Sequence, residues 1–254
     1  MLSASNMPPP QDHHDFPKGE QPTTVLLLPT FTIIDNVTPV SVPELIHYFV
    51  DHAPTTTTPL HVSSSLSKPT TNGTSSEPPS IDSADHFSPL DDPTTTVTPS
   101  IPSVPASNSH PFTTRPCPHL AIILICSQKT RDARCGQSAP LLRREFERQL
   151  RHLGLYRDMH DERPGGVGIY FISHVGGHKF AANVMVYRRG AIEEKESRGQ
   201  DSRGGEATQG IWLARVRPED CEGIVKFTVL KGKVVKPERQ LRGGFDRARG
   251  LVSW

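Results

Sequence analysis

A long segment rich in Ser, Thr and Pro divides this chain of 254 residues and limits how much of it can fold. Of the 64 residues from 53 to 116, 38 are Ser, Thr or Pro. Such a segment cannot bury enough apolar surface to offset the entropy lost on ordering it, so we expect a disordered linker. Residues 1–23 are polar and Pro-rich, and we expect them to be disordered too. The pattern predicts one compact domain, residues 117–254, behind a largely disordered N-terminal half.

Residues 24–52 contain the single structured piece that we expect before the linker. The stretch 24–35 (TVLLLPTFTIID) is apolar and β-branched, which is typical of a strand, and Pro29 interrupts it. Pro43 then opens a short helical stretch, 44–52. One strand and one helix are too little to fold alone, so we expect an isolated β–α remnant.

The periodicity of residues 117–254 predicts a mixed sheet with packed helices. Residues 119–126 (HLAIILIC) form a continuous apolar run, which indicates a strand buried on both faces. A helix is expected from Ser138, a capping residue, with Pro140 in its first turn, to about residue 153. Three strands (167–173, 180–187, 211–216) and a last helix (218–230) follow. The order β-α-β-β-β-α defines an α/β class and is compatible with a thioredoxin-like fold.

The charge balance and the cysteines suggest an intracellular setting. Residues 1–116 carry 3 basic and 11 acidic residues, whereas residues 117–254 carry 25 and 16. A basic module can attract an acidic protein or nucleic acid, but no aromatic residues interleave the Arg-rich helix, so nucleic-acid binding is disfavoured. No secretory signal or transit peptide is evident, and 25–28 is too short to span a membrane. In a reducing compartment, cysteines bind metal or do redox chemistry more often than they form structural disulfides.

Two cysteines and two histidines form the pattern that carries chemistry. Cys126 and Cys135 bracket one loop, and His174 and His178 bracket a second loop, HVGGH. Each loop leaves the end of an expected strand, and in open α/β sheets ligands bind at the carboxyl ends of strands. If the two strands are neighbours, all four side chains point into one crevice. Two thiolates and two imidazoles suit either Zn or a 2Fe–2S cluster.

The spacing favours a cluster over zinc. Structural Zn sites usually separate their cysteines by two to four residues, whereas eight residues separate Cys126 from Cys135. A binuclear cluster needs a wider cage, and Gly136 would let the backbone approach an inorganic core. Lys129, Arg131 and Arg134 favour the thiolate form and offset the cluster's negative charge. Neutral imidazole ligands raise the reduction potential, and their second proton can couple to electron transfer.

The sequence also resembles a known family. The strings CSQKTRDARCGQSAPLL, HVGGHKFAANVMVY, GIWLARVRPED and LRGG are similar to those of the fungal sucrase/ferredoxin-like proteins. The resemblance implies a thioredoxin-like ferredoxin domain that binds a 2Fe–2S cluster through Cys126, Cys135, His174 and His178. Members usually begin with a further cysteine-bearing half-domain, but no cysteine precedes Cys117. We therefore expect a shortened or degenerate member.

The favoured function is electron transfer or redox and thiol quality control, rather than an enzyme with its own substrate. No acidic pair suggests a glycosidase, and we expect no catalytic residues. Two alternatives remain open: an interaction module with a Zn site or no metal, and a thiol oxidoreductase using Cys126 and Cys135. The partner would be a redox protein of unknown identity. The resemblance implies a mitochondrial or cytosolic location.

Cys117, Cys221 and Trp254 lie outside this ligand set. Cys117 is expected to be a bystander, and Cys221, beside Asp220 and Glu222, is expected to be inert. The ending LVSW resembles the short tail by which some iron–sulfur proteins are handed to their assembly machinery. Packing of Trp254 on the domain is the competing explanation.

Overall fold

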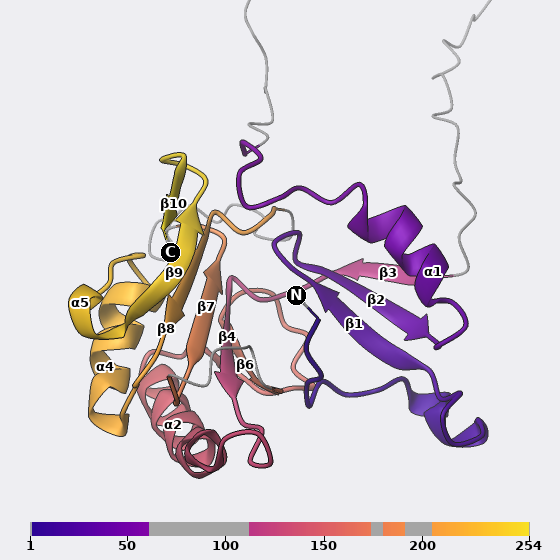
Figure 1. Ribbon diagram of the computed structural model, residues 1–254, viewed down its shortest axis with the longest axis horizontal. Coiled ribbons are helices and arrows are strands. Elements are labelled where there is room, and N and C mark those ends of the chain that lie inside the picture. Colours follow the sequence, from indigo (N-terminus) through magenta and orange to yellow (C-terminus); the bar gives the residue numbers. More distant parts are fainter. Residues whose placement is uncertain (1, 61–111, 174–179, 191–204, 254) are drawn as a thin grey trace, which may run out of the picture. The chain divides into compact units, whose positions relative to one another are not determined.

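The computed structural model describes residues 2–60, 112–173, 180–190 and 205–253 (Figure 1). These residues belong to one compact unit that joins the N-terminal 60 residues to the region from residue 110 onward. Most of the expected linker, both histidines of the HVGGH loop and Trp254 lie outside the described residues.

A seven-stranded mixed sheet forms the centre of the molecule, in the order β10-β9-β8-β7-β4-β6-β5. Strands β4 and β6 are parallel neighbours, and β7 runs antiparallel on the other side of β4. The strands are β4 (Ala121–Cys126), β5 (Tyr156–Arg157), β6 (Val167–Ile172), β7 (Val184–Arg188), β8 (Gln209–Leu213), β9 (Leu241–Asp246) and β10 (Leu251–Ser253). Four strands and their order along the chain were expected, whereas β5, β9 and β10 were not. The expected mixed α/β class is confirmed, and the thioredoxin-like topology remains a prediction.

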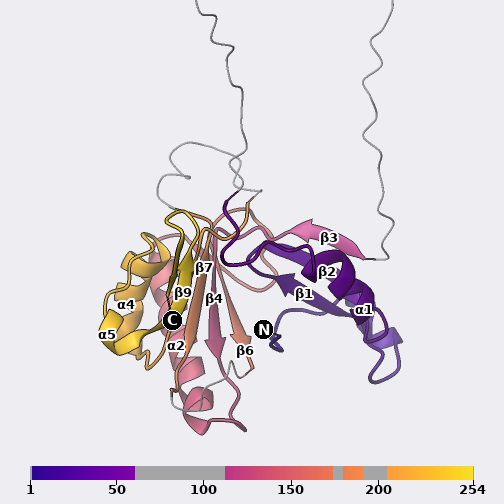
Figure 2. The same ribbon diagram turned by 45° about the horizontal axis from the view of Figure 1, so that its top comes forward.

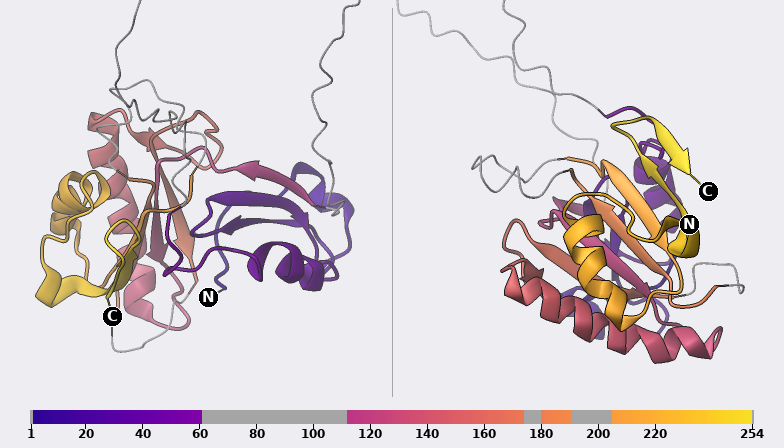
Figure 3. Two further views of the ribbon diagram at one scale, coloured as in Figure 1. Left: turned by 90° about the horizontal axis from the view of Figure 1, so that it is seen from above. Right: turned by 90° about the vertical axis from the view of Figure 1, so that its left-hand side faces the viewer.

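Helices cover one face of this sheet (Figures 1 and 3). They are α2 (Ala133–His152), a continuous helical stretch made of η3 (Pro218–Asp220), α4 (Cys221–Gly223) and η4 (Ile224–Val229), and the short α5 (Pro237–Gln240). The buried residues of α2 recur every three or four positions, so one apolar stripe faces the strands. Ile123 and Ile125 of β4 pack against this stripe in the main core, together with β7 and η4.

A second sheet, β1-β2-β3, contradicts the expectation of an isolated remnant (Figure 2). Strands β1 (Thr23–Leu27) and β2 (Thr32–Val37) form a hairpin, and β3 (Thr113–Pro116) pairs antiparallel with β2. The helical turns α1 (Val42–Leu45) and η2 (Ile46–Val50) follow. This second sheet also packs against the central sheet, because Phe31 and Ile33 share a buried cluster with Ile122 and Tyr170. The expected linker therefore ends earlier than residue 116.

Residues near the N-terminus are also ordered against the central sheet, contrary to expectation. Ser5 forms an antiparallel bridge with Ile172, on the edge of β6 that the short β5 leaves uncovered. The Asn6 carboxamide accepts the Phe171 N–H at 2.7 Å, and the Ala4 carbonyl accepts the Ser173 N–H at 2.7 Å. Further along, η1 (Gln11–Asp15) forms a turn of 3₁₀ helix. The expectation of disorder over 1–23 was therefore wrong. Backbone pairing of this kind leaves no periodic pattern in a polar sequence from which it could have been predicted.

No helix in the described ranges combines the length and the apolar character that crossing a membrane requires.

Candidate metal centre

Cys126 ends β4, and its surroundings join three strands. Its side chain is fully buried, and its N–H donates to the Asn183 carbonyl at 3.0 Å, just before β7. In the parallel ladder Cys126 pairs with Ile172, the last residue of β6. The N–H and hydroxyl of Ser127 both donate to the Ile172 carbonyl, at 2.9 and 3.2 Å. The condition that the strand before Cys126 neighbours the strand before the histidines is thus met.

His174 and His178 lie outside the described residues, but both ends of the segment that holds them are placed. Ser173 directly follows β6, and Phe180 precedes β7. In the sheet, β4 lies between β6 and β7. The described residues that flank the histidine-bearing segment therefore lie on either side of the strand that ends in Cys126. The position of the imidazoles themselves remains a prediction.

Cys135 lies in the first turn of α2, because this helix begins well before the expected start at Ser138. Asp132 caps the helix, and its carboxylate accepts the Arg134 N–H at 3.0 Å. Ser138 instead lies within the helix and donates its hydroxyl to the Arg134 carbonyl at 2.8 Å. The loop between the cysteines is therefore short, and a rigid helix positions the fully buried Cys135.

Gly136 permits a close contact with Lys129, and its expected approach to an inorganic core remains a prediction. A Cβ at Gly136 would lie 2.6 Å from the Cβ and 2.9 Å from the Cα of Lys129. The missing side chain therefore lets the loop after Cys126 pack directly against the first turn of α2. The glycine fixes the spacing between the two cysteine-bearing segments.

The charges around the loop are unevenly paired. Arg134 donates two N–H groups to the Asp132 carboxylate, at 3.0 and 2.9 Å. This bidentate contact holds the pKa of Asp132 below its usual value. Lys129 and Arg131 are exposed, and the described part of the chain offers them no carboxylate partner. The loop is therefore positively charged, as expected beside thiolate ligands.

The donor chemistry fits a cluster at the end of β4. All four cysteines are described, and none forms a disulfide. Side chains alternate along a strand, so Cys126 shares the face of Ile122 and Leu124, whereas α2 packs on the face of Ile123 and Ile125. A group that both sulfurs bind must then lie beyond the end of the strand. Among the described residues, no three Cys, His, Asp or Glu side chains form a metal-binding group, and His174 and His178 lie outside these residues.

Asn183 is a residue of this region that sequence reasoning missed. It is 2% exposed, and its side-chain amide donates to the Phe180 carbonyl at 3.1 Å. Its own carbonyl accepts the Cys126 N–H. Asn183 thus connects Cys126 to the return of the histidine-bearing segment. The signal that could have identified Asn183 was a polar amide residue directly before the apolar run of β7.

The other two cysteines lie in separate surroundings. Burial raises the pKa of the Cys221 thiol, and the carboxylates of Glu145 and Asp220 raise it further. Burial also raises the pKa of the Cys117 thiol, which lies beneath the β1-β2-β3 sheet. A raised pKa disfavours the thiolate, the form that reacts and binds metal. The structure thus supports the expected inert role of Cys221 and of Cys117.

A buried histidine lies on the face of the central sheet that the β1-β2-β3 sheet covers, and its role is structural. His119 is 2% exposed, and its Nε2 lies 3.3 Å from the Tyr170 hydroxyl. Both side chains line a cavity of about 700 Å³ against the β1-β2-β3 sheet. Burial, assisted by the positive charge of Arg157, lowers the pKa of His119 to about 4. His119 is therefore neutral at physiological pH.

We expect the stability of the chain to fall in weak acid because of His119. Its folded pKa of about 4 lies below the ordinary 6.5, so the unfolded state binds more protons between these values. The contribution is complete above about pH 6.5 and is lost as the pH falls toward 4. At 1.36 kcal/mol per unit it amounts to about 3 kcal/mol. The free energy of unfolding of the metal-free chain, measured in urea across this pH range, should change less with pH in His119→Gln than in the wild type. The control His152→Gln on α2 should keep the wild-type pH dependence. A parallel slope in all three would contradict the assignment.

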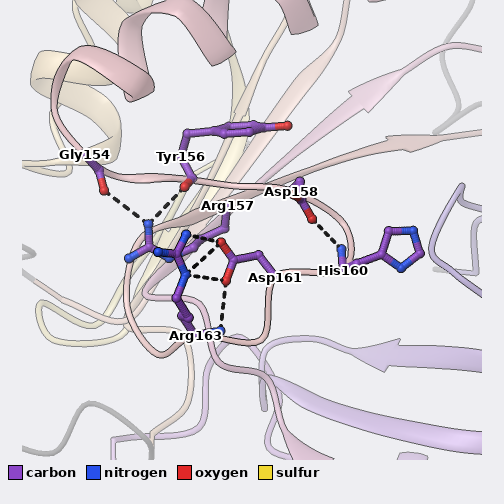
Figure 4. Close-up of polar contacts among 7 residues, drawn as sticks. All are labelled: Gly154, Tyr156, Arg157, Asp158, His160, Asp161 and Arg163. Atoms are coloured by element: carbon purple, nitrogen blue, oxygen red, sulfur yellow. Dashed lines mark hydrogen bonds and ion pairs between the residues drawn. The ribbon is translucent and has the colours of Figure 1, made fainter.

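The charged residues that follow α2 form hydrogen bonds and ion pairs with one another and with the backbone of their own loop, and they do not form an open anion site (Figure 4). Arg157 donates to the carbonyls of Gly154 and Tyr156, at 3.1 and 2.9 Å. Arg163 donates to both carboxylate oxygens of Asp161. These contacts lower the pKa of Asp161. The guanidinium groups are thus used to order the connection between β5 and β6.

The described fold and the buried cysteines define a mixed α/β domain with candidate metal ligands at the end of a central strand. The family comparison is more specific: residues 1–243 match the sucrase/ferredoxin-like family model. The chain belongs to the sucrase/ferredoxin-like family, as its motifs indicated.

Two curated relatives each match about half of this chain. Actin patches distal protein 1 of Saccharomyces cerevisiae is 41% identical over 117 residues, 46% of this chain and 32% of that protein. Altered inheritance of mitochondria protein 32 of Clavispora lusitaniae is 34% identical over 135 residues, 53% of this chain and 39% of that protein. The chain covers about a third of the length of these relatives. No solved structure matches it significantly.

Proposed function

We propose that this chain is a redox protein that binds a 2Fe–2S cluster through Cys126, Cys135, His174 and His178. The observation that supports this most is the parallel pairing of β4 and β6, which places Cys126 opposite Ile172, two residues before His174. Cys135, buried in the first turn of α2, supplies the second sulfur. Membership of the ferredoxin-like family is consistent with this ligand set. When bound, such a cluster supplies a one-electron couple.

The chain's own residues would hold, shield and balance this group. The thiols are fully buried, so the protein excludes water from the sulfurs. Lys129 and Arg131 offset negative charge from the solvent side. Each ligating imidazole would hold a proton on its other nitrogen, and we propose that this proton makes the reduction potential depend on pH. Electron transfer, in redox or thiol quality control, is the function that these properties suit.

Burial argues against the thiol oxidoreductase alternative. A cysteine pair that exchanges disulfides with substrates needs an accessible, low-pKa sulfur. Cys126 and Cys135 are both fully buried. A Zn site remains the competing metal, because two thiolates and two imidazoles suit it as well.

Iron and acid-labile sulfide analysis of anaerobically purified full-length chain tests the proposal. We expect about two irons and two sulfides per chain, with visible absorption between about 400 and 600 nm that changes with pH. A colourless protein with about one zinc per chain would identify a Zn site instead. A protein with neither metal would leave an interaction module.

The location and the assembly partner are also proposals. The name of the second relative suggests a mitochondrial link, and we propose a mitochondrial or cytosolic location. Residues 251–253 pair with β9 as an edge strand, and Trp254 directly follows them in the sequence. We propose that this end contacts the iron–sulfur assembly machinery.

We expect deletion of Trp254 to lower iron content in cells several-fold without changing chemical reconstitution. A terminal recognition contact affects delivery, whereas the ligand set is intact in the purified chain. Iron per chain should be compared after expression in cells and after reconstitution with iron and sulfide. Trp254→Phe, which keeps an aromatic ring, is the matched control and should retain most of the iron. Equal iron in cells with and without Trp254 would exclude this role.

A further inference from the structure

The outer face of α2 carries a continuous stripe of exposed residues that do not contribute to the core. They are spaced three or four positions apart, so they share one face of the helix. We call this stripe the basic face: Arg134, Gln137, Leu141, Arg144, Arg148 and Arg151. It contains four arginines and no acid. Figure 3 shows α2 packed along one face of the sheet, and the buried residues of α2 lie on the side that contacts the sheet.

The acids of α2 do not cancel this charge on the face itself. Glu145 pairs with Arg148, and Glu147 pairs with Arg143 and Arg151. The side chains of both acids are only about one-fifth exposed, at 22% and 21%. They lie on the flanks and hold the arginines in place rather than facing solvent.

Three cations of this surface lack a carboxylate partner within the described ranges. Arg144 lies on the basic face, and Lys129 and Arg131 lie in the loop after Cys126. The backbone of Lys129 packs against the first turn of α2 at Gly136, so the loop continues the face. Residues 127–152 contain seven Lys/Arg and three Asp/Glu, a surplus of four positive charges. This surplus begins at the turn that holds Cys135.

Leu141 gives the same surface an apolar centre. Its side chain is 53% exposed on a helix whose other apolar positions are mostly buried. A small apolar contact inside a ring of charge is a common arrangement for transient docking. Charge attracts the partner, and desolvation of the leucine fixes its position.

We propose that the basic face and the loop carrying Lys129 and Arg131 form the docking surface for an electron-transfer partner with an acidic surface. The proposal rests on the proposed function, because the surface adjoins Cys135. The charge surplus selects a partner of opposite sign and accelerates encounter. A partner bound there would lie beside the sulfur-bearing turn of α2.

A peptide titration tests the surface without requiring a cluster. The probe is a fluorescein-labelled peptide of repeating Glu-Glu-Leu, and the readout is anisotropy at low salt. In the full chain, Arg131→Glu with Arg144→Glu should raise Kd about tenfold. The matched control, Lys231→Glu with Lys233→Glu, removes the same net charge from the exposed turn after η4 and should change Kd less than about twofold. Leu141→Ala should weaken binding without altering its salt dependence. Equal weakening by both double variants would overturn the proposal.

Oxidation of the cluster-loaded chain then tests the redox role. The reduced protein gives one electron to ferricyanide, an anion, which becomes ferrocyanide. We expect the Arg131→Glu, Arg144→Glu variant to react several-fold more slowly than the control at low salt and equally fast at high salt. With cationic cobalt hexaammine the order should reverse. If the chain binds no cluster, the proposed function fails. The peptide titration still shows whether the basic face binds an acidic partner. If peptide binding depends on the face but both double variants react equally with ferricyanide, the surface does not serve electron transfer.

Discussion

Replacing either Cys126 or Cys135 by Ser is expected to remove nearly all bound iron and sulfide. Changes that only perturb the surroundings of a metal site cost roughly 10- to 100-fold in affinity, and loss of a ligand should cost more. Each sulfur is fully buried in a separate segment, so neither can replace the other. Iron, sulfide and visible absorption of each variant, prepared anaerobically beside the wild type, measure this loss.

Cys221→Ser is the matched control. Cys221 is as buried as the proposed ligands, and its sulfur already lies 3.7 Å from the Arg217 carbonyl, to which a hydroxyl can donate. It should keep its full iron content. Full iron in the Cys126 and Cys135 variants, or equal loss in the control, would show that these two sulfurs are not specific ligands.

The histidines separate the cluster from thiol chemistry. His174→Ala and His178→Ala should also lose iron, or shift the spectrum and its pH dependence. A thiol oxidoreductase would instead form a Cys126–Cys135 disulfide and keep its activity in both histidine variants. Thermal unfolding adds a second readout, because a metal bound only by the folded state stabilises it and this gain should vanish in every ligand variant.

Local patterns were sufficient where burial was continuous along the chain. The apolar runs that became β4 and β6 were identified with little error, and so was the helical stretch beginning at Pro218. That they are neighbours was only a condition of the predicted site, and the structure supplies their parallel pairing. Cys126 was therefore placed correctly at the carboxyl end of a central strand.

The start of α2 was mistaken because two capping signals compete. Ser138 and Pro140 resemble a helix start, but Asp132 caps the helix earlier. Pro140 then lies inside the helix, where proline is usually disfavoured. The error moved Cys135 from a rigid helical turn into a flexible loop, which matters directly for the geometry of the candidate site.

Pairing between distant segments had no local signature. Strand β3 comes from a Thr- and Pro-rich stretch and exists because its backbone meets β2, helped by the Arg115–Asp35 ion pair at 2.9 Å. Strand β9 begins with Leu-Arg-Gly-Gly, and glycine disfavours strands. Gly210 accounts for part of this: a Cβ there would lie 2.3 Å from the Phe245 ring of β9. Such contacts are properties of the fold and not of the segment.

Replacing Arg188 by Met is expected to lower the free energy of unfolding by about 3 kcal/mol or more, because each buried acceptor left without a donor costs roughly 1 to 3 kcal/mol. Arg188 is 4% exposed at the end of β7, and burial lowers its pKa. Its guanidinium donates to the carbonyls of Val229 and Leu230, at 2.9 and 2.6 Å, and to the side chain of Gln209. It therefore satisfies the last carbonyls of η4 and joins that helix to the sheet. Met keeps the aliphatic volume but leaves these acceptors buried without a donor.

The effect should depend on burial and not on the loss of an arginine as such. Arg148→Met on α2 makes the same change at a side chain that is 58% exposed and paired with Glu145, where ion pairs contribute less than about 1 kcal/mol. Arg188→Lys should fall between the two, because an ammonium can donate to the helix end but lacks the planar fork. Urea unfolding of the metal-free chains at neutral pH compares all three. Similar losses for Arg188→Met and Arg148→Met would mean that the helix end finds other donors, and that Arg188 does not couple η4 to the strand beside Cys126.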